Sequence, residues 1–319
     1  MHIPDGFIDA KTAIAASVLS AAGLGAALHH AKRRMPRKKV PLMGLAAAFV
    51  FAAQMLNFPV AAGTSGHLIG AVLAGVLLGP SAAVIVMTAV LVVQCLLFAD
   101  GGISALGANI FNMAIMGSLG GYGVYAALRR MFGGARGRIM AVAFASWFST
   151  VIASVCCAGE LAWSGTAAWS AAFPAMAGAH MLIGLGEGVI TALVVVAVDQ
   201  AGLEVYAEDR AQAGERYGQL MVFGSLIALG LALFVSPFAS AWPDGLEKAA
   251  AALGFEHKAV AQPILASPLA DYRIPGLASA SVATALAGAA GTAVVFLLSW
   301  LLARLLVPTS ARAERRSAA

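Results

Sequence analysis

The first residues of the chain hold donor atoms that could bind one metal ion together. The sequence opens with MHIPDGF, which puts a free amino group one residue before His2. The amino nitrogen, the His2 amide nitrogen and His2 Nδ1 could close a five-membered and a six-membered chelate ring. A square plane would then have one open place for a distant ligand, and neutral imidazole is the usual one. An interfacial histidine at a chain end fits the same residues, so this segment alone leaves both interpretations open.

The elements that must position these atoms are membrane helices. Of the 319 residues, 61% are hydrophobic and only 11% are charged, whereas soluble domains carry roughly 25% charged residues. The composition therefore predicts an all-α polytopic membrane protein. A hydrocarbon core of about 30 Å needs long apolar segments. We expect about nine spans, near residues 12–30, 41–56, 67–79, 82–98, 105–128, 139–158, 176–198, 218–236 and 277–303.

The basic residues predict the orientation of these spans. Sixteen of the twenty Lys and Arg residues lie in four segments, namely KRRMPRKK, RRMFGGARGR, the stretch 199–217 and the stretch from Arg304 onward. Cytoplasmic loops carry an excess of Lys and Arg, which predicts an N-terminus outside and a C-terminus inside. His2, His67 and His180 then lie at or near the outer mouth of the bundle.

Four segments resemble a known family. MHIPDGF, NFPVAAGTSGHLIG (57–70), GGISALGANIFNM (101–113) and HMLIGLGEGVIT (180–191) are similar to the nickel/cobalt substrate-capture (M-type) component of energy-coupling-factor transporters over about residues 1–200. WPDGLEKAAAALGF (242–255) and SPLADYRIPGL (267–277) resemble the two-span N-type partner, which residues 218–319 would form after a cytoplasmic linker, 201–217. The resemblance implies a seven-helix bundle, a six-helix core plus an extra N-terminal helix, followed by a two-helix module.

The resemblance also implies a ligand set. The metal would be held by the Met1 amino nitrogen, the amide and imidazole of His2, and the imidazole of His67. A tetragonal plane of nitrogens favours Ni²⁺ or Cu²⁺, and MHIPDG resembles the nickel branch of the family. We expect Ni²⁺ as the transported substrate, with Co²⁺ as the alternative. The competing hypothesis is an intramembrane metalloenzyme using His67, His180 and Glu187, although a catalytic metal keeps an open position.

Other polar residues are candidates for the pathway or for support around the site. Glu187 is an intramembrane carboxylate, and such groups are commonly functional. His180, seven residues earlier, would lie about 10 Å from it along a helix axis, so the two cannot ligate one ion. We expect Asn57, Asn109 and Asn112 to hydrogen-bond the loops around the site. Packing between helices is the alternative role for Glu187 and for the three asparagines.

The partners follow from a stripe of small residues and from an absent motif. Gly44, Ala48 and Ala52 repeat every fourth residue; the family resemblance implies contact with the transmembrane coupling subunit, and packing inside the bundle is the alternative. The sequence holds no G-x-x-x-x-G-K-[ST] phosphate loop. Uptake would therefore need the ATPase subunits that the family supplies. We expect a non-enzymatic transport subunit in a prokaryotic cell membrane, in contact with the lipid bilayer and with no nucleic-acid partner.

The outer loop of the second module predicts a short helix. In PDGLE, Asp244 is a plausible N-cap, and Glu247 three residues later completes a capping box. Gly254 would end this helix. We expect no metal chemistry in this loop.

Overall fold

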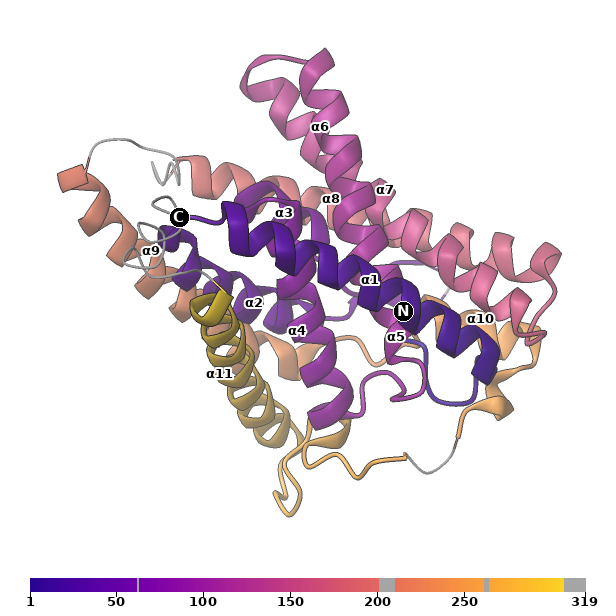
Figure 1. The fold of residues 1–319 in the computed structure, drawn as a ribbon. Coiled ribbons are helices and arrows are strands. Elements are labelled where there is room, and N and C mark those ends of the chain that lie inside the picture. Colours follow the sequence, from indigo (N-terminus) through magenta and orange to yellow (C-terminus); the bar gives the residue numbers. More distant parts are fainter. Residues whose placement is uncertain (62, 201–209, 261–263, 307–319) are drawn as a thin grey trace, which may run out of the picture.

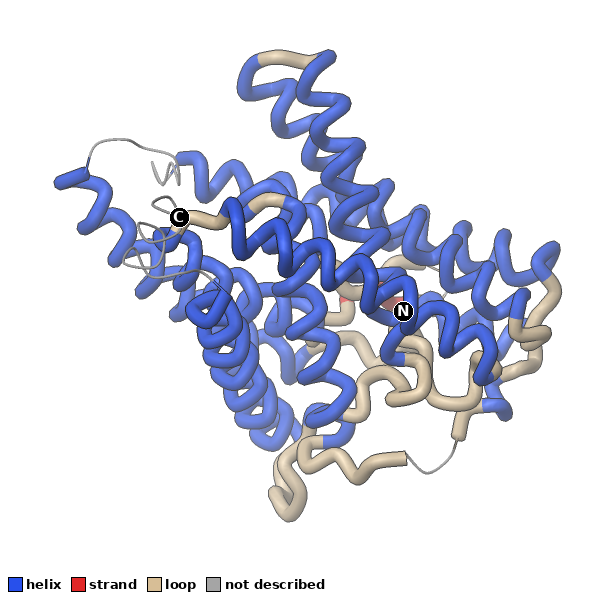
Figure 2. Tube along the Cα trace, in the orientation of Figure 1, coloured by secondary structure: helices blue, strands red, loops and turns tan. Residues whose placement is uncertain are grey.

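The protein is almost entirely helical. The computed structural model describes residues 1–319 except 62, 201–209, 261–263 and 307–319, and helices dominate that part of the chain (Figure 2). Two short antiparallel strands pair, β1 (Phe58–Pro59) with β2 (Ser65–Gly66). The helices are α1 (Ala10–Arg34), α2 (Val40–Gln54), α3 (Ala71–Leu78), α4 (Pro80–Phe98), α5 (Leu106–Asn109), α6 (Gly121–Met131), α7 (Gly134–Trp163), α8 (Trp169–Gln200), α9 (Arg210–Gly230), α10 (Gly245–Leu253) and α11 (Ala280–Leu306).

Six of the described helices are long and apolar enough to cross a membrane: Ala10–Arg34, Pro80–Phe98, Gly134–Trp163, Trp169–Gln200, Tyr217–Phe238 and Ala280–Leu306. They confirm the polytopic all-α class. A π-helical stretch, Ile110–Gly120, joins α5 to α6 into one run where a single span was expected. The exact number of spans and their orientation stay predictions.

One expected span, 67–79, is wrong. Helix α3 has 8 residues, about 12 Å of rise, which cannot cross a core of about 30 Å. Glycines with positive φ flank it, Gly70 at 78° and Gly79 at 95°. This backbone conformation suits glycine and interrupts the apolar segment at both ends. His67 therefore lies in a loop before α3 and not in a long helix.

The second module contacts the first at two separate places. Helices α9 and α11 both pack against α2, whereas the short α10 packs against α8. Figure 1 shows α9 and α11 on one side of the molecule and α10 on the other, close to the chain start. Residues 201–209 of the expected linker lie outside the described residues, and the remainder, from Arg210, begins α9. The segment between α9 and α11 thus reaches the N-terminus, while these two long helices pack on α2.

The small-residue stripe on α2 is buried inside the protein. Gly44, Ala48 and Ala52 are all buried. A Cβ added at Gly44 would lie 3.0 Å from the Phe296 carbonyl oxygen and 3.2 Å from Trp300 Cβ, both on α11. At Gly44, α11 therefore occupies the position where we expected a separate coupling subunit. This contact fits the alternative interpretation, in which the small residues pack within the protein.

Candidate metal-capture site

The chain start is buried and is held by its own backbone. Ile3 is fully buried, and its N–H donates to Asn109 Oδ1 at 2.8 Å. Asn109 Nδ2 donates back to the Ile3 carbonyl at 3.1 Å, and the Gly102 N–H donates to the same oxygen at 2.8 Å. Asn109 is therefore a two-point clamp that fixes the backbone two residues after the amino group.

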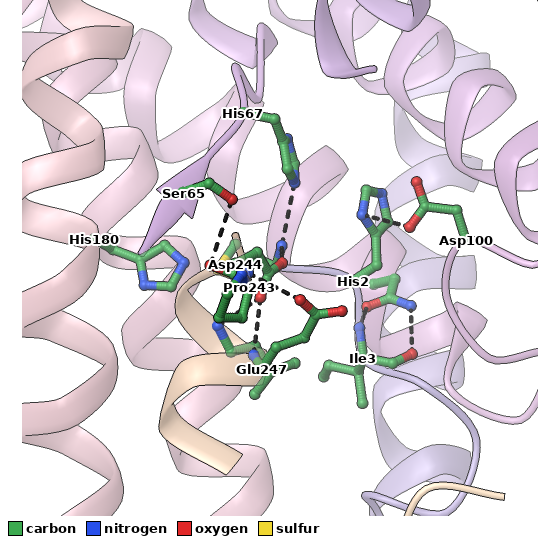
Figure 3. A network of polar contacts seen from close by, with 12 residues as sticks. His2, Ile3, Ser65, His67, Asp100, His180, Pro243, Asp244 and Glu247 are labelled. Carbon is green, nitrogen blue, oxygen red and sulfur yellow. Dashed lines mark hydrogen bonds and ion pairs between the residues drawn. The ribbon is translucent and has the colours of Figure 1, made fainter. Parts of the chain in front are cut away.

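The Met1 amine contacts both His67 and Asp244, and Figure 3 shows the His67 side chain pointing toward Asp244. The amine nitrogen is 3.1 Å from His67 Nε2 and forms an ion pair with Asp244 Oδ2. His67 Nδ1 lies 3.1 Å from the Leu68 carbonyl oxygen. A carbonyl can only accept, so Nδ1 carries the proton and Nε2 keeps its lone pair toward the amine. This is the tautomer in which Nε2 can bind a metal.

The spacing of these two nitrogens suits adjacent metal ligands. Nitrogens bound at about 2.0–2.1 Å from one ion at neighbouring corners of a square lie about 2.9 Å apart. The observed 3.1 Å is close to that distance. A cavity of about 10 Å³ adjoins them, roughly the space of one water molecule. Its lining comprises Met1, Gly66, His67, Ile69, Thr150, His180, Ile183, Asp244 and Gly245.

The His2 ring is turned toward two other acceptors. Its Nδ1 is 3.1 Å from Asp100 Oδ1 and its Nε2 is 3.2 Å from Gln94 Oε1. The ring stacks on His67 with centroids 5.3 Å apart. Burial lowers the pKa of His2 below its usual value, although Asp100 works in the opposite direction. Coordination through Nδ1 requires the ring to leave Asp100.

The carboxylates around the amine control its charge. Burial acts to lower the pKa of the Met1 amine, but Asp244, helped by Asp100 and Glu247, raises this pKa above its usual value. Burial likewise acts to raise the pKa of Asp244, and the adjacent amine holds it well below its usual range. The amine and Asp244 therefore form a part-buried ammonium–carboxylate pair.

Asp244 is also the N-cap of α10. Its Oδ1 accepts from the N–H groups of Leu246 at 2.7 Å and Glu247 at 2.9 Å. Glu247 Oε2 accepts from the Asp244 N–H at 2.9 Å. These contacts confirm the predicted capping box, and Gly254 ends the helix in a left-handed conformation. The sequence predicted no metal chemistry in this loop, and that stays a prediction, but the second oxygen of Asp244 contacts the Met1 amine.

Contacts on both sides of Asp244 hold this loop on the first module. Ser65 N–H donates to the Pro243 carbonyl at 2.9 Å, and Ser65 Oγ donates to the Trp242 carbonyl at 2.6 Å. On the other side, a Cβ added at Gly245 would lie 2.5 Å from His180 Cε1. Only a residue without a side chain fits this approach. The module is therefore bound to the strand that leads into His67.

Glu187 anchors the segment after His67. Its carboxylate accepts from the Ile69 and Gly70 N–H groups, both at 3.0 Å, and from Thr150 Oγ1 at 2.6 Å. His180 Nδ1 donates to the Met176 carbonyl at 2.7 Å. Among the described residues, no three His, Cys, Asp or Glu side chains form a metal-binding group. The ligand set of the alternative enzyme hypothesis, His67, His180 and Glu187, does not converge.

The two remaining asparagines contact other parts of the protein. The carbonyl of Asn57 accepts from the Ser240 N–H at 2.8 Å, a backbone contact between the modules. Asn112 Nδ2 donates to Glu160 Oε2 at 2.7 Å. Sequence analysis did not place Asp100, Gln94 or Asp244 at the site, although it identified Asp244 as a helix N-cap.

Comparison with known families divides the chain into two regions. A model of the cobalt uptake substrate-specific transmembrane region matches residues 2–205, and a model of the PDGLE domain matches residues 218–308. The chain belongs to the cobalt uptake substrate-specific transmembrane family. It is therefore a multi-pass membrane protein and a substrate-specific transport subunit, with a second, PDGLE region.

Relatives share both regions or the first alone. A putative fused nickel transport protein of Archaeoglobus fulgidus is 40% identical over 306 residues, covering 95% of this chain and 98% of its own. A cobalt transport protein of Thermosediminibacter oceani is 34% identical, covering 61% of this chain and 82% of its own. A solved transition metal transporter has a TM-score of 0.59 and 32% identity, covering 69% of this chain and 99% of its own.

Proposed function

We propose that this protein captures Ni²⁺ at its outer face with four nitrogens and passes it on for ATP-driven uptake. The ligands are the Met1 amino nitrogen, the His2 amide nitrogen, His2 Nδ1 and His67 Nε2. The observation that carries the proposal is the 3.1 Å spacing of the Met1 nitrogen and His67 Nε2, in the tautomer that can bind a metal. Binding turns the His2 ring away from Asp100 and into the plane.

Nickel is favoured over cobalt for two reasons. Nitrogen donors in a tetragonal plane suit Ni²⁺, and the relative from Archaeoglobus fulgidus that covers both regions is described as a nickel transport protein. Relatives described as cobalt transport proteins match the first region, so Co²⁺ is the alternative substrate.

Transport requires partner subunits in this proposal. The sequence holds no phosphate loop for ATP, so energy comes from a transmembrane coupling subunit and an ATPase pair of the energy-coupling-factor type. With the orientation predicted from the basic residues, the site opens to the outside and the partners act from the cytoplasm. Glu187 and Asn109 hold the two ligand segments in place.

Nickel binding by the purified protein tests the proposal. Calorimetry on protein that begins at Met1 should give one tight Ni²⁺ per chain. The complex should be yellow and diamagnetic, because a planar four-nitrogen field makes Ni²⁺ low-spin. A paramagnetic six-coordinate nickel spectrum at neutral pH would refute the four-nitrogen site.

A further inference from the structure

We propose that Asp244 of the PDGLE segment positions the Met1 amine as a metal ligand, so that both modules build the capture site. This inference rests on the proposed function. The direct contact is the ion pair between Asp244 Oδ2 and the Met1 nitrogen, which joins residues 243 positions apart in the chain. Met1 is 4% exposed, and this contact lies beside the His67 nitrogen in the protein interior.

Asp244 keeps a role when a metal is bound. The free amine is an ammonium group with three N–H bonds; one points to Asp244 and another to His67 Nε2. When a metal takes the place of one proton, the coordinated amine still has two N–H bonds. One of these can remain on Asp244 Oδ2. The carboxylate then fixes the direction of the nitrogen lone pair, as outer-shell carboxylates do for metal-bound histidines.

Asp244 is held rigidly enough for this role. Its other oxygen accepts two N–H groups at the start of α10, at 2.7 and 2.9 Å. The loop is fixed on one side by Ser65 and on the other by the close approach of Gly245 to His180. Oδ2 is thereby directed at the amine by contacts independent of the metal.

The substitution Asp244→Asn isolates the carboxylate. Asparagine is as good an N-cap as aspartate, so α10 and its docking are kept while the charged acceptor is lost. The nickel-loaded full-length protein is mixed with excess chelator, and the rate of nickel release is followed by the loss of the nickel absorption band. Loss of an outer-shell partner typically costs 10–100-fold in metal affinity. We expect nickel release from Asp244→Asn to be about 10–100-fold faster than from the native protein.

Two matched variants exclude indirect effects. Glu247→Gln removes a neighbouring negative charge from the same helix turn, while its amide oxygen can still accept from the Asp244 N–H. Glu256→Gln removes a negative charge from the exposed turn that follows α10, away from the amine. Both should release nickel within about threefold of the native rate, because neither touches the amine.

The outcomes separate this inference from the function on which it rests. If His67→Ala abolishes tight nickel binding but Asp244→Asn releases nickel at the native rate, Asp244 has no positioning role and the inference is wrong. Equal acceleration by Glu247→Gln or Glu256→Gln would also overturn it, because the loss of any nearby negative charge would then explain the effect. If His67→Ala binds nickel as tightly as the native protein, the ligand set itself fails.

Discussion

One residue added before Met1 should abolish the site that the chain start forms. The Met1 nitrogen already contacts His67 Nε2 and Asp244 Oδ2, and the adjoining cavity is only about 10 Å³. An added residue lengthens the chain by about 3.3–3.6 Å. The new amino group therefore cannot reach the same position while the clamp on Ile3 persists.

The size of the effect follows from the groups that lose their partners. Removing one member of a buried ion pair costs about 3–5 kcal/mol, and the Asp244 side chain is 17% exposed, which favours the lower end. We expect the docking of the PDGLE loop to weaken by about 3 kcal/mol. The amine would no longer directly precede His2, so nickel would lose one ligand and the fused chelate rings. Nickel affinity should therefore fall at least about tenfold, equivalent to about 1.4 kcal/mol.

Calorimetry on two proteins measures this loss. One begins at Met1 and the other carries a single additional glycine before it, both released from a cleavable fusion and purified in the same detergent. A glycine added after Ala319 is the control and should leave nickel affinity unchanged. Equal nickel affinity of the native and N-terminally extended proteins would show that the amine is not a ligand.

Three further predictions concern individual groups. His67→Ala should remove tight nickel binding and His257→Ala should not, with His180→Ala intermediate; stoichiometric binding by His67→Ala in a titration would contradict the ligand assignment. Glu187→Gln should lower the free energy of unfolding by about 3 kcal/mol, because hydrogen bonds to charged groups contribute about 1.5–3 kcal/mol each and an amide offers one accepting oxygen in place of two. An unchanged melting temperature would contradict the anchoring role. Because Asp244 raises the pKa of the Met1 amine, stability from their pair is fully present below the usual amine pKa of about 8 and is lost as the pH rises through the raised value. Nickel affinity should change in the opposite sense, rising through that range as the proton competes less, and a flat affinity between pH 6.5 and 9 by calorimetry would refute this.

Local patterns in the sequence predicted the helical class and the start of α10. The capping box needs residues only three positions apart, so Asp244 and Glu247 were sufficient to identify it. The apolar segment 67–79 predicted a helix that is too long. Composition does not show that Gly70 and Gly79 adopt positive φ and interrupt the helix. Apolar content predicts membrane residence, whereas helix length depends on the backbone conformation of single glycines.

The site was predicted only in part, for a physical reason. The spacing of Met1 and His2 predicts their chelate, because the donors are adjacent along the chain. The contact of Asp244 with the amine depends on the docking of a loop 243 residues away. The sequence explains Asp244 fully as a helix N-cap, but capping occupies only Oδ1. Oδ2 remains available to accept from a donor that is distant in the chain. Such a pairing follows from tertiary structure and not from local pattern.

The inward direction of the chain start restricts how this protein can acquire new domains. The Met1 amino group faces His67 and Asp244 in the protein interior, so a polypeptide attached before it would have to pass through the site. With the proposed ligand set, a polypeptide fused upstream would remove the amine and with it one nickel ligand, even if both parts folded. A domain joined downstream avoids this conflict, and the PDGLE domain of this chain follows the first region.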